Sequence, residues 1–117
     1  HSVTLLGGHL NHNTLSCGGA QALEYLNTVN IDTAVMATSG FSVEYGFTSG
    51  SYTDCEVKRA VITRARRTIM LVDSSKIGRS LPTTFANLSD VEIIVSDVKP
   101  TEDIINACAE AGVQLVF

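Results

Sequence analysis

The sequence predicts an α/β fold in which a mostly parallel sheet carries helices on both faces. Apolar, β-prone segments alternate along the chain with segments whose apolar residues recur at helical spacing. The length of 117 residues suits one hydrophobic core. A composition of 44% hydrophobic and 17% charged residues excludes a disordered chain.

The first third of the chain is expected to run strand, helix, strand. Residues 2–6 are short, apolar and β-prone, and the polar residues 9–13 after them are expected to form a loop. Apolar residues at helical spacing predict a helix over 16–27, with Ser16 as its cap. The apolar run over 31–37 predicts a buried strand.

The middle of the chain begins with a long connection over 38–53 that contains three glycines. A structureless loop of that length in a compact domain is usually functional. Asp54 is expected to cap a helix that runs to about Arg67, and the apolar runs over 68–72 and 91–95 predict two further strands.

The last helix has the clearest start signal, because Thr101 precedes two acidic residues that suit the first turn. Gly112 is expected to end this helix, and residues 113–117 are expected to form the last strand. Parallel sheets bind ligands at the carboxyl ends of their strands. The candidate site is therefore expected in the loops that follow residues 6, 37, 72 and 95.

Charge and cysteine content narrow the function classes. Eight Lys and Arg against 12 Asp and Glu give a net charge of −4, which argues against unaided nucleic-acid binding. No apolar run is long enough to cross a membrane, and no signal peptide opens the chain. Cys17, Cys55 and Cys108 are expected to be reduced thiols of a cytosolic protein, because their number is odd and no CxxC pair exists.

No metal or cofactor is expected. His9 and His12 could share a metal ion, but no further ligand accompanies them, so a solvated loop is the favoured interpretation. The phosphate-binding patterns GxGxxG and GxxxxGK[ST] are absent from the sequence.

The segment Asp73-Ser74-Ser75-Lys76 is the most informative stretch, because it follows an apolar strand directly. A lysine at that edge offers a point charge for a phosphate or an acidic sugar. The alternative is a polar turn in which Asp73 caps the next helix and Lys76 stays in water. We expect Lys76 to lie beside the glycine-containing loops if the first interpretation holds.

The glycine-containing connection is the second candidate, through Ser39, Gly40, Gly46 and Thr48. Glycines let the backbone approach a ligand, and consecutive amides can bind an anion; a plain surface loop is the alternative.

Gly7-Gly8 could play the same part after the first strand, or could serve close packing of backbones. Five cations are expected on the helix after residue 54, and most of them would form a solvated face. Glu56 and Lys58 lie in its first turn, near the glycine-containing loop.

Four motifs in register resemble the sensor domains of DeoR-type transcriptional regulators. The resemblance covers nearly the whole chain, and its motifs agree with the family in order and spacing. They are Leu5-Leu6-Gly7-Gly8 with Thr14-Leu15-Ser16 and Gly18-Gly19-Ala20, then Asp32-Thr33-Ala34 with Ser39-Gly40-Phe41 and Gly46-Phe47-Thr48, then Asp54-Cys55-Glu56-Val57-Lys58-Arg59-Ala60, and Asp73-Ser74-Ser75-Lys76-Ile77-Gly78.

The resemblance implies a C-terminal effector-binding domain over residues 1–117, from a bacterial regulator of sugar metabolism that is expected to be a repressor. It implies a fold similar to ribose-5-phosphate isomerase and the CoA-transferases. A phosphorylated sugar would bind this domain and alter the DNA affinity of a homo-oligomeric, cytoplasmic protein. The ligand contacts that it implies are Gly7, Gly8, Ser39, Gly40, Gly46, Thr48, Glu56, Lys58, Asp73 and Lys76.

The family's Gly-Thr-Thr and Thr-Asn segments have no counterpart here and would lie before His1. We therefore expect the domain to be truncated on its N-terminal side, and the winged helix-turn-helix to lie outside this sequence. An isomerase-like enzyme on the same fold is the alternative function, but Asp32 is followed by no acid through Phe41 that could act as a general base. A third interpretation is an oligomerisation module whose pocket is vestigial.

Overall fold

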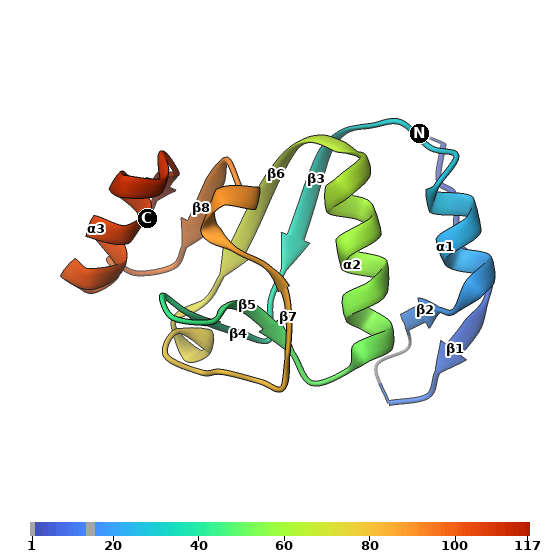
Figure 1. Cartoon of the computed structure of the whole chain (residues 1–117), viewed down its shortest axis with the longest axis horizontal. Helices are drawn as coiled ribbons and strands as arrows, with labels where there is room; N and C mark the ends of the chain where they lie inside the picture. The colour runs from blue at the N-terminus through green and yellow to red at the C-terminus, as the bar shows by residue number, and fades with distance from the viewer. Residues whose placement is uncertain (1, 14–15) are drawn as a thin grey trace.

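A parallel sheet of four strands forms the centre of the molecule. The computed structural model describes residues 2–13 and 16–117. The strands lie in the order β3 (Ile31–Ala37), β6 (Ala65–Val72), β8 (Ile93–Ser96) and β9 (Gln114–Val116). The prediction of an α/β fold with a mostly parallel sheet is confirmed (Figure 1). The likeness to ribose-5-phosphate isomerase stays a prediction.

One face of this sheet packs into the hydrophobic core. The register aligns Met36 with Met70, Met70 with Ile94, and Ile94 with Leu115, so these side chains share a face. Helices α2 (Tyr52–Arg64) and α3 (Glu102–Ala111) contribute to the same core. The core cluster consists of Phe41, Phe47, Cys55, Met70, Val72, Phe85, Ala86, Val91, Ile94, Ile104, Cys108 and Val113.

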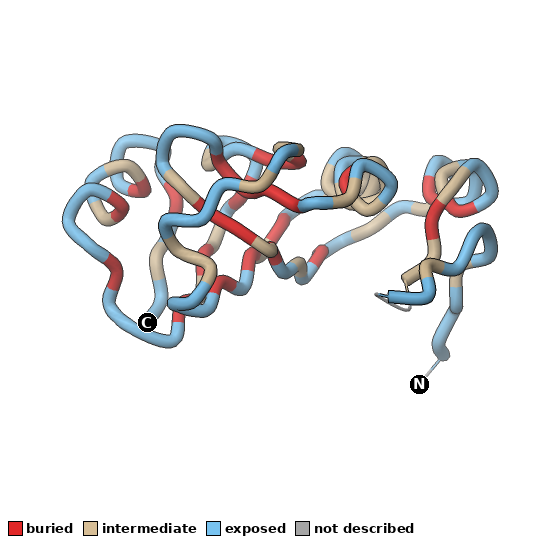
Figure 2. Tube along the Cα trace, turned by 90° about the horizontal axis from the view of Figure 1, so that it is seen from below, coloured by how far each residue is buried: buried red, intermediate tan, exposed pale blue. Residues whose placement is uncertain are grey.

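The opposite face of the sheet is bare in the described part of the chain. Val35, Leu71 and Val116 alternate with the core-facing residues and are 61%, 44% and 41% exposed. Figure 2 shows this alternation of buried and exposed residues along the trace. The expectation of helices on both faces is therefore met on one face only.

Helices α2 and α3 start and stop at local signals. Ser51, rather than the expected Asp54, caps α2, because its side chain accepts a hydrogen bond from the Asp54 amide. Thr101 precedes α3 and Gly112 ends it in the left-handed conformation, as predicted.

The end of α2 differs from the prediction. The helix stops at Arg64, and the extended backbone of Ala65 starts β6. Arg66 and Arg67 therefore lie on a strand, where they pair with Asp32 at 3.7 Å and with Glu92 at 3.1 Å. The prediction that the helix continues to Arg67 is wrong, because Arg66 and Arg67 belong to β6, the strand that pairs with β3.

The expected long loop over 38–53 is wrong as well, because most of it forms a hairpin. Strands β4 (Gly40–Ser42) and β5 (Gly46–Ser49) pair antiparallel, and β5 pairs with β7 (Thr83–Ala86), which the sequence did not predict. Phe41 and Phe47 stack with ring centroids 4.7 Å apart. This small sheet lies beyond the carboxyl end of β3 (Figure 1).

The N-terminal part forms a separate ribbon and helix. Strands β1 (His9–Asn11) and β2 (Ser16–Gly18) pair antiparallel, and α1 (Ala20–Leu26) packs against α2 (Figure 1). The expected strand over 2–6, loop over 9–13 and cap at Ser16 are wrong. Val3 and Leu5 are 88% and 87% exposed because no described strand pairs with them, and Gly19 caps α1.

Two short 3₁₀ helices, η1 (Ser74–Lys76) and η2 (Leu88–Asp90), complete the fold. Thr14 and Leu15 of the first family motif lie outside the described residues. Cys17, Cys55 and Cys108 are free, as expected. No helix in residues 2–13 or 16–117 is long and apolar enough to cross a bilayer.

Candidate functional site

The carboxyl end of β3 is fixed by a buried threonine. Thr38 is 6% exposed. Its Oγ1 donates to the Gly40 carbonyl at 2.7 Å, with the Thr48 carbonyl at 3.2 Å as a second acceptor. One hydroxyl therefore holds the turn by which the chain leaves the sheet and enters the β4–β5 hairpin.

The segment that contains Lys76 lies beside this hairpin, as expected from the sequence. The Gly78 amide donates to the Phe41 carbonyl at 2.8 Å, and Ile77 forms a bridge with Phe41. Gly40 is in close contact with the same segment, because a Cβ at this position would lie 2.7 Å from the carbonyl oxygen of Arg79. Lys76 is half-buried at the end of η1.

Asp73 stabilises the turn that follows β6 at this edge of the sheet. Its carboxylate accepts hydrogen bonds from the Ser75 amide at 2.9 Å and from the Ser75 hydroxyl. These bonds hold the pKa of Asp73 below its ordinary value, and the charge of Lys76 lowers the pKa further. The polar-turn interpretation of Asp73 is thus realised, since the residue caps η1.

A second carboxylate joins the loops after β6 and β8. The amide and hydroxyl of Ser74 donate to the two oxygens of Asp97, at 2.8 and 3.2 Å. Asp73 and Asp97 both line a shallow hollow of about 270 Å³ at the ends of these strands. The sequence analysis marked the loop after residue 95 but did not name Asp97. This residue could have been found because it directly follows β8, just as Asp73 directly follows β6.

Lys58 reaches from α2 to the end of β3. Its Nζ donates to the Ala37 carbonyl at 3.1 Å and lies 4.7 Å from the centre of the Phe85 ring. Burial lowers the pKa of this ammonium, and the nearby Asp54 and Cys55 oppose the shift. A partly desolvated cation therefore lies where the chain leaves the sheet.

All three lysines of the sequence are associated with the carboxyl edge of the sheet. Lys58 contacts the end of β3, Lys76 follows β6, and Lys99 lies three residues after β8. Arg66 and Arg67 lie at the opposite, amino edge. Lys99 was not among the predicted residues, although it lies in a loop that sequence reasoning marked.

Several residues that were predicted to contact the ligand are instead buried within the fold. Thr48 is fully buried, and its Oγ1 accepts from the Leu81 amide at 3.0 Å. Gly46 is buried against β7, where a Cβ would lie 2.5 Å from the Ala86 carbonyl oxygen. Both residues attach the hairpin to residues 81–86. Ser39, beside Thr38, is half-buried at the edge itself.

Glu56 and the first glycine pair are not brought next to Lys58. Glu56 lies two residues along α2 from Lys58, which turns it about 200° around the helix axis. A Cβ on Gly8 would lie 2.3 Å from the Gly18 carbonyl oxygen, so Gly8 serves close packing of backbones, whereas a Cβ on Gly7 would meet only the Gln21 side chain at 3.8 Å. The parts of all these residues in ligand binding stay predictions.

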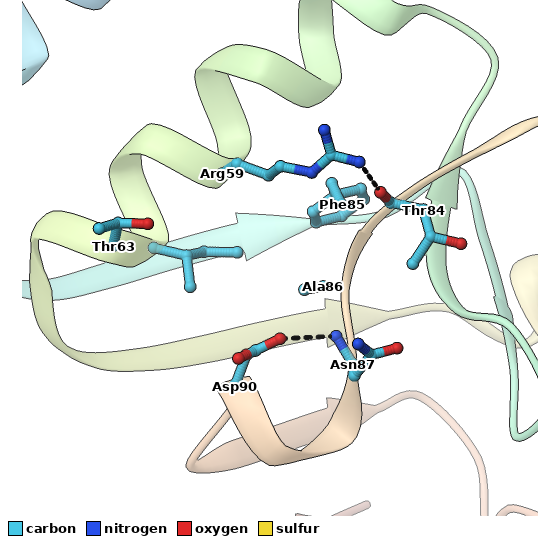
Figure 3. Close-up of a pocket in the computed structure, with 8 residues that line it drawn as sticks. Arg59, Thr63, Thr84, Phe85, Ala86, Asn87 and Asp90 are labelled. Carbon is cyan, nitrogen blue, oxygen red and sulfur yellow. Dashed lines mark hydrogen bonds between the residues drawn. The ribbon is translucent and has the colours of Figure 1, made fainter.

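A larger hollow of about 360 Å³ lies between α2 and the segment that comprises β7 and the residues after it (Figure 3). Its charged groups are already bonded to protein atoms. Arg59 donates to the Thr84 carbonyl, and Asp90 accepts from the Asn87 amide at 2.9 Å.

Comparison with known families identifies the class of protein. Residues 1–98 match the family model described as the DeoR C terminal sensor domain. The chain belongs to this family. The resemblance seen in the sequence is thereby confirmed, and the DeoR sensor domain here has the central parallel sheet described above.

Relatives of this DeoR sensor domain are transcriptional regulators. The HTH-type transcriptional repressor GlcR of Bacillus subtilis is 30% identical over 97% of this chain and 44% of its own length. The glycerol-3-phosphate regulon repressor of Escherichia coli is 24% identical over 97% of this chain and 45% of its own. The HTH-type transcriptional regulator GlpR of Haloferax volcanii is 27% identical over 99% and 46%. The chain thus spans less than half the length of these relatives.

Proposed function

We propose that this DeoR sensor domain binds a phosphorylated sugar or polyol at the carboxyl edge of its parallel sheet, and that binding changes the DNA affinity of the full-length regulator. The observation that carries the proposal is the half-buried ammonium of Lys58 at the end of β3, with Lys76 on the neighbouring strand's loop. The name of the glycerol-3-phosphate regulon repressor, a relative, is consistent with a phosphorylated effector.

The charges along the edge favour one orientation of such a ligand. An ammonium that burial has stripped of water gains most from a dianionic phosphate, which also restores its pKa. The carboxylates of Asp73 and Asp97 repel a phosphate but accept hydrogen bonds from hydroxyl groups. The phosphate is therefore expected near Lys58 and Lys76, with sugar hydroxyls toward the hollow between β6 and β8.

Regulation follows from differential affinity. A ligand that binds one arrangement of the edge loops better than another shifts the population toward it, and coupling of about 1–3 kcal/mol is typical. DNA would be contacted by a winged helix-turn-helix elsewhere in the full-length protein, which we propose to be a cytoplasmic homo-oligomer. Catalysis has less support, because Asp32 lies at the amino edge of the sheet and pairs with Arg66.

The test measures operator binding by the full-length protein, by fluorescence anisotropy, against a panel of phosphorylated sugars and polyols that includes glycerol 3-phosphate. Lys76→Ala and Lys58→Met are expected to raise the effector concentration needed for half-response about tenfold or more, with operator affinity unchanged. Arg66→Ala, which removes a cation from the opposite edge, is the matched control and should respond as the wild type does. Equal responses from all three variants would refute the site.

A further inference from the structure

The short helix η1 carries Lys76 but has little structure of its own with which to hold it. It comprises three residues, and a 3₁₀ helix of that length makes few internal hydrogen bonds. In the described part of the chain, no ion pair fixes the Lys76 ammonium. The place of this cation at the carboxyl edge therefore depends on the contacts that attach η1 to the rest of the fold.

One of these contacts lies after η1 and attaches it to the β4–β5 hairpin. The Gly78 amide donates to the Phe41 carbonyl at 2.8 Å, and Ile77 forms a bridge with Phe41. At the start of η1, Asp73 accepts a hydrogen bond from the Ser75 amide at 2.9 Å. That bond shapes the turn but ties it to no other element, because both residues belong to the same short segment.

Asp97 supplies the missing attachment at the start of η1. The first amide of a helix has no acceptor within the helix itself. Here the Ser74 amide donates to one carboxylate oxygen of Asp97 at 2.8 Å, and the Ser74 hydroxyl donates to the other oxygen at 3.2 Å. Hydrogen bonds to a charged acceptor are stronger than those between neutral groups. The loop after β8 thus holds the helix that follows β6.

Asp97 is itself held in place by the residues on either side of it. Ser96, the last residue of β8, is 6% exposed, and its hydroxyl donates to the Val98 carbonyl at 2.8 Å. The Val98 amide lies 3.4 Å from the same oxygen. The carboxylate therefore projects from a closed turn at the end of a core strand.

We propose that Asp97 is a positioning residue of the ligand-binding edge. Through Ser74 it holds η1, and η1 keeps the Lys76 ammonium where a phosphate would bind. The inference rests on the proposed function, because it takes Lys76 as a phosphate contact. Its sign is distinctive, since removal of a negative charge near a phosphate would by itself strengthen binding. Weaker binding after the loss of Asp97 therefore reports the loss of position.

Two substitutions in the full-length protein break the attachment from its two sides. Asp97→Asn removes the charge and one of the two acceptors. Ser74→Pro removes both donors and leaves Asp97 intact. Proline suits the first helical position, and the extended backbone of Asp73, with φ −82° and ψ 157°, suits the residue before a proline. We therefore expect η1 to keep its shape in this variant and to lose only its attachment to β8.

The probe is inorganic phosphate, the group that all phosphorylated effectors share, and its binding is followed by the NMR shifts of the amides over 73–78. Asp97→Asn and Ser74→Pro are expected to raise the dissociation constant about threefold to tenfold. Asp90→Asn is the matched control, because Asp90 accepts an amide bond at 2.9 Å at the 3₁₀ helix η2, which carries no cation. It should bind phosphate as the wild type does.

A double variant separates positioning from a general structural effect. If Asp97 and Ser74 act through Lys76, adding Ser74→Pro to Lys76→Ala should change the dissociation constant by less than about twofold. A combined loss equal to the product of the two single losses would overturn the inference. So would wild-type affinity in both Asp97→Asn and Ser74→Pro while Lys76→Ala binds weakly, and the proposed function would then stand. Unchanged affinity in Lys76→Ala itself would refute Lys76 as a phosphate contact, and the inference with it.

Discussion

Single residues at the carboxyl edge divide into those that build it and those that can meet a ligand. Thr38 and Thr48 are buried, and both hydroxyls bond to backbone groups: Thr38 donates to the Gly40 carbonyl of the hairpin, and Thr48 accepts from the Leu81 amide. Lys58 and Lys76 are half-buried and keep ammonium donors for a ligand. The family motifs therefore contain residues of both kinds, and only contacts in the folded chain separate them.

Asp73 supplies a test of the local electrostatics at residue scale. Hydrogen bonds from Ser75 favour its charged form, so its folded pKa lies below the unfolded one. Its contribution to stability is present above the unfolded pKa and is lost as the pH falls through the lower, folded value. Ser75→Ala removes the hydroxyl donor, so the pKa of Asp73 should rise toward its ordinary value and this pH dependence should shrink.

Carboxyl chemical shifts followed by NMR during an acid titration measure the change. Asp103 is the control, because its pKa is lowered mainly by a different hydroxyl, that of Thr101, and should not move. An unchanged pKa of Asp73 in Ser75→Ala would show that the serine hydroxyl is not what stabilises the carboxylate.

At the scale of elements, the hairpin turn depends on a glycine for two reasons that can be separated. Gly46 has a φ of 76°, and a Cβ there would lie 2.5 Å from the Ala86 carbonyl oxygen. Gly112, which ends α3, has a φ of 74° with no neighbouring atom within 4 Å of such a Cβ. Gly112→Ala should therefore cost only the backbone term, about 1–2 kcal/mol.

Gly46→Ala should cost that term and an overpacking penalty of about 1–3 kcal/mol more. Urea denaturation of the two variants measures the difference in the free energy of unfolding. Equal losses would mean that β5 and β7 can separate locally without cost, which the buried hairpin described here does not allow.

Strongly patterned elements were predictable from the sequence, and short or unpartnered ones were not. The strand over 31–37 and the helix that starts after Thr101 carry their own signals, an apolar run and an acidic first turn respectively. Strands β4, β5 and β7 have three or four residues each, too few for a periodicity to emerge. The segment over 2–6 has a strand's composition but no described neighbour, and a strand forms only with a partner.

The position of the candidate site was predictable from the sequence, but the set of residues that form it was less so. The rule that ligands bind beyond the carboxyl ends of parallel strands indicated this edge, and the segment that contains Lys76 lies beside the hairpin as expected. Gly46, Thr48 and Gly8 turned out to pack against other parts of the chain, because spacing does not reveal which side of a hairpin is buried. Lys99 and Asp97 were missed because no motif includes them.

At the scale of the whole molecule, the chain is one-sided. Its connections all lie on one face of the parallel sheet, and its lysines are associated with the carboxyl edge of that sheet. The second property is the reason why we propose that edge for an anion.

The position of the phosphate group tests this account most directly. The measurement is a crystal structure of the full-length protein with the phosphorylated compound that most strongly changes its operator binding. We expect a phosphate within hydrogen-bond distance of Lys58 or Lys76, beyond the carboxyl ends of β3 and β6. A phosphate in the hollow beside Arg59, or at the amino edge beside Arg66 and Arg67, would contradict it.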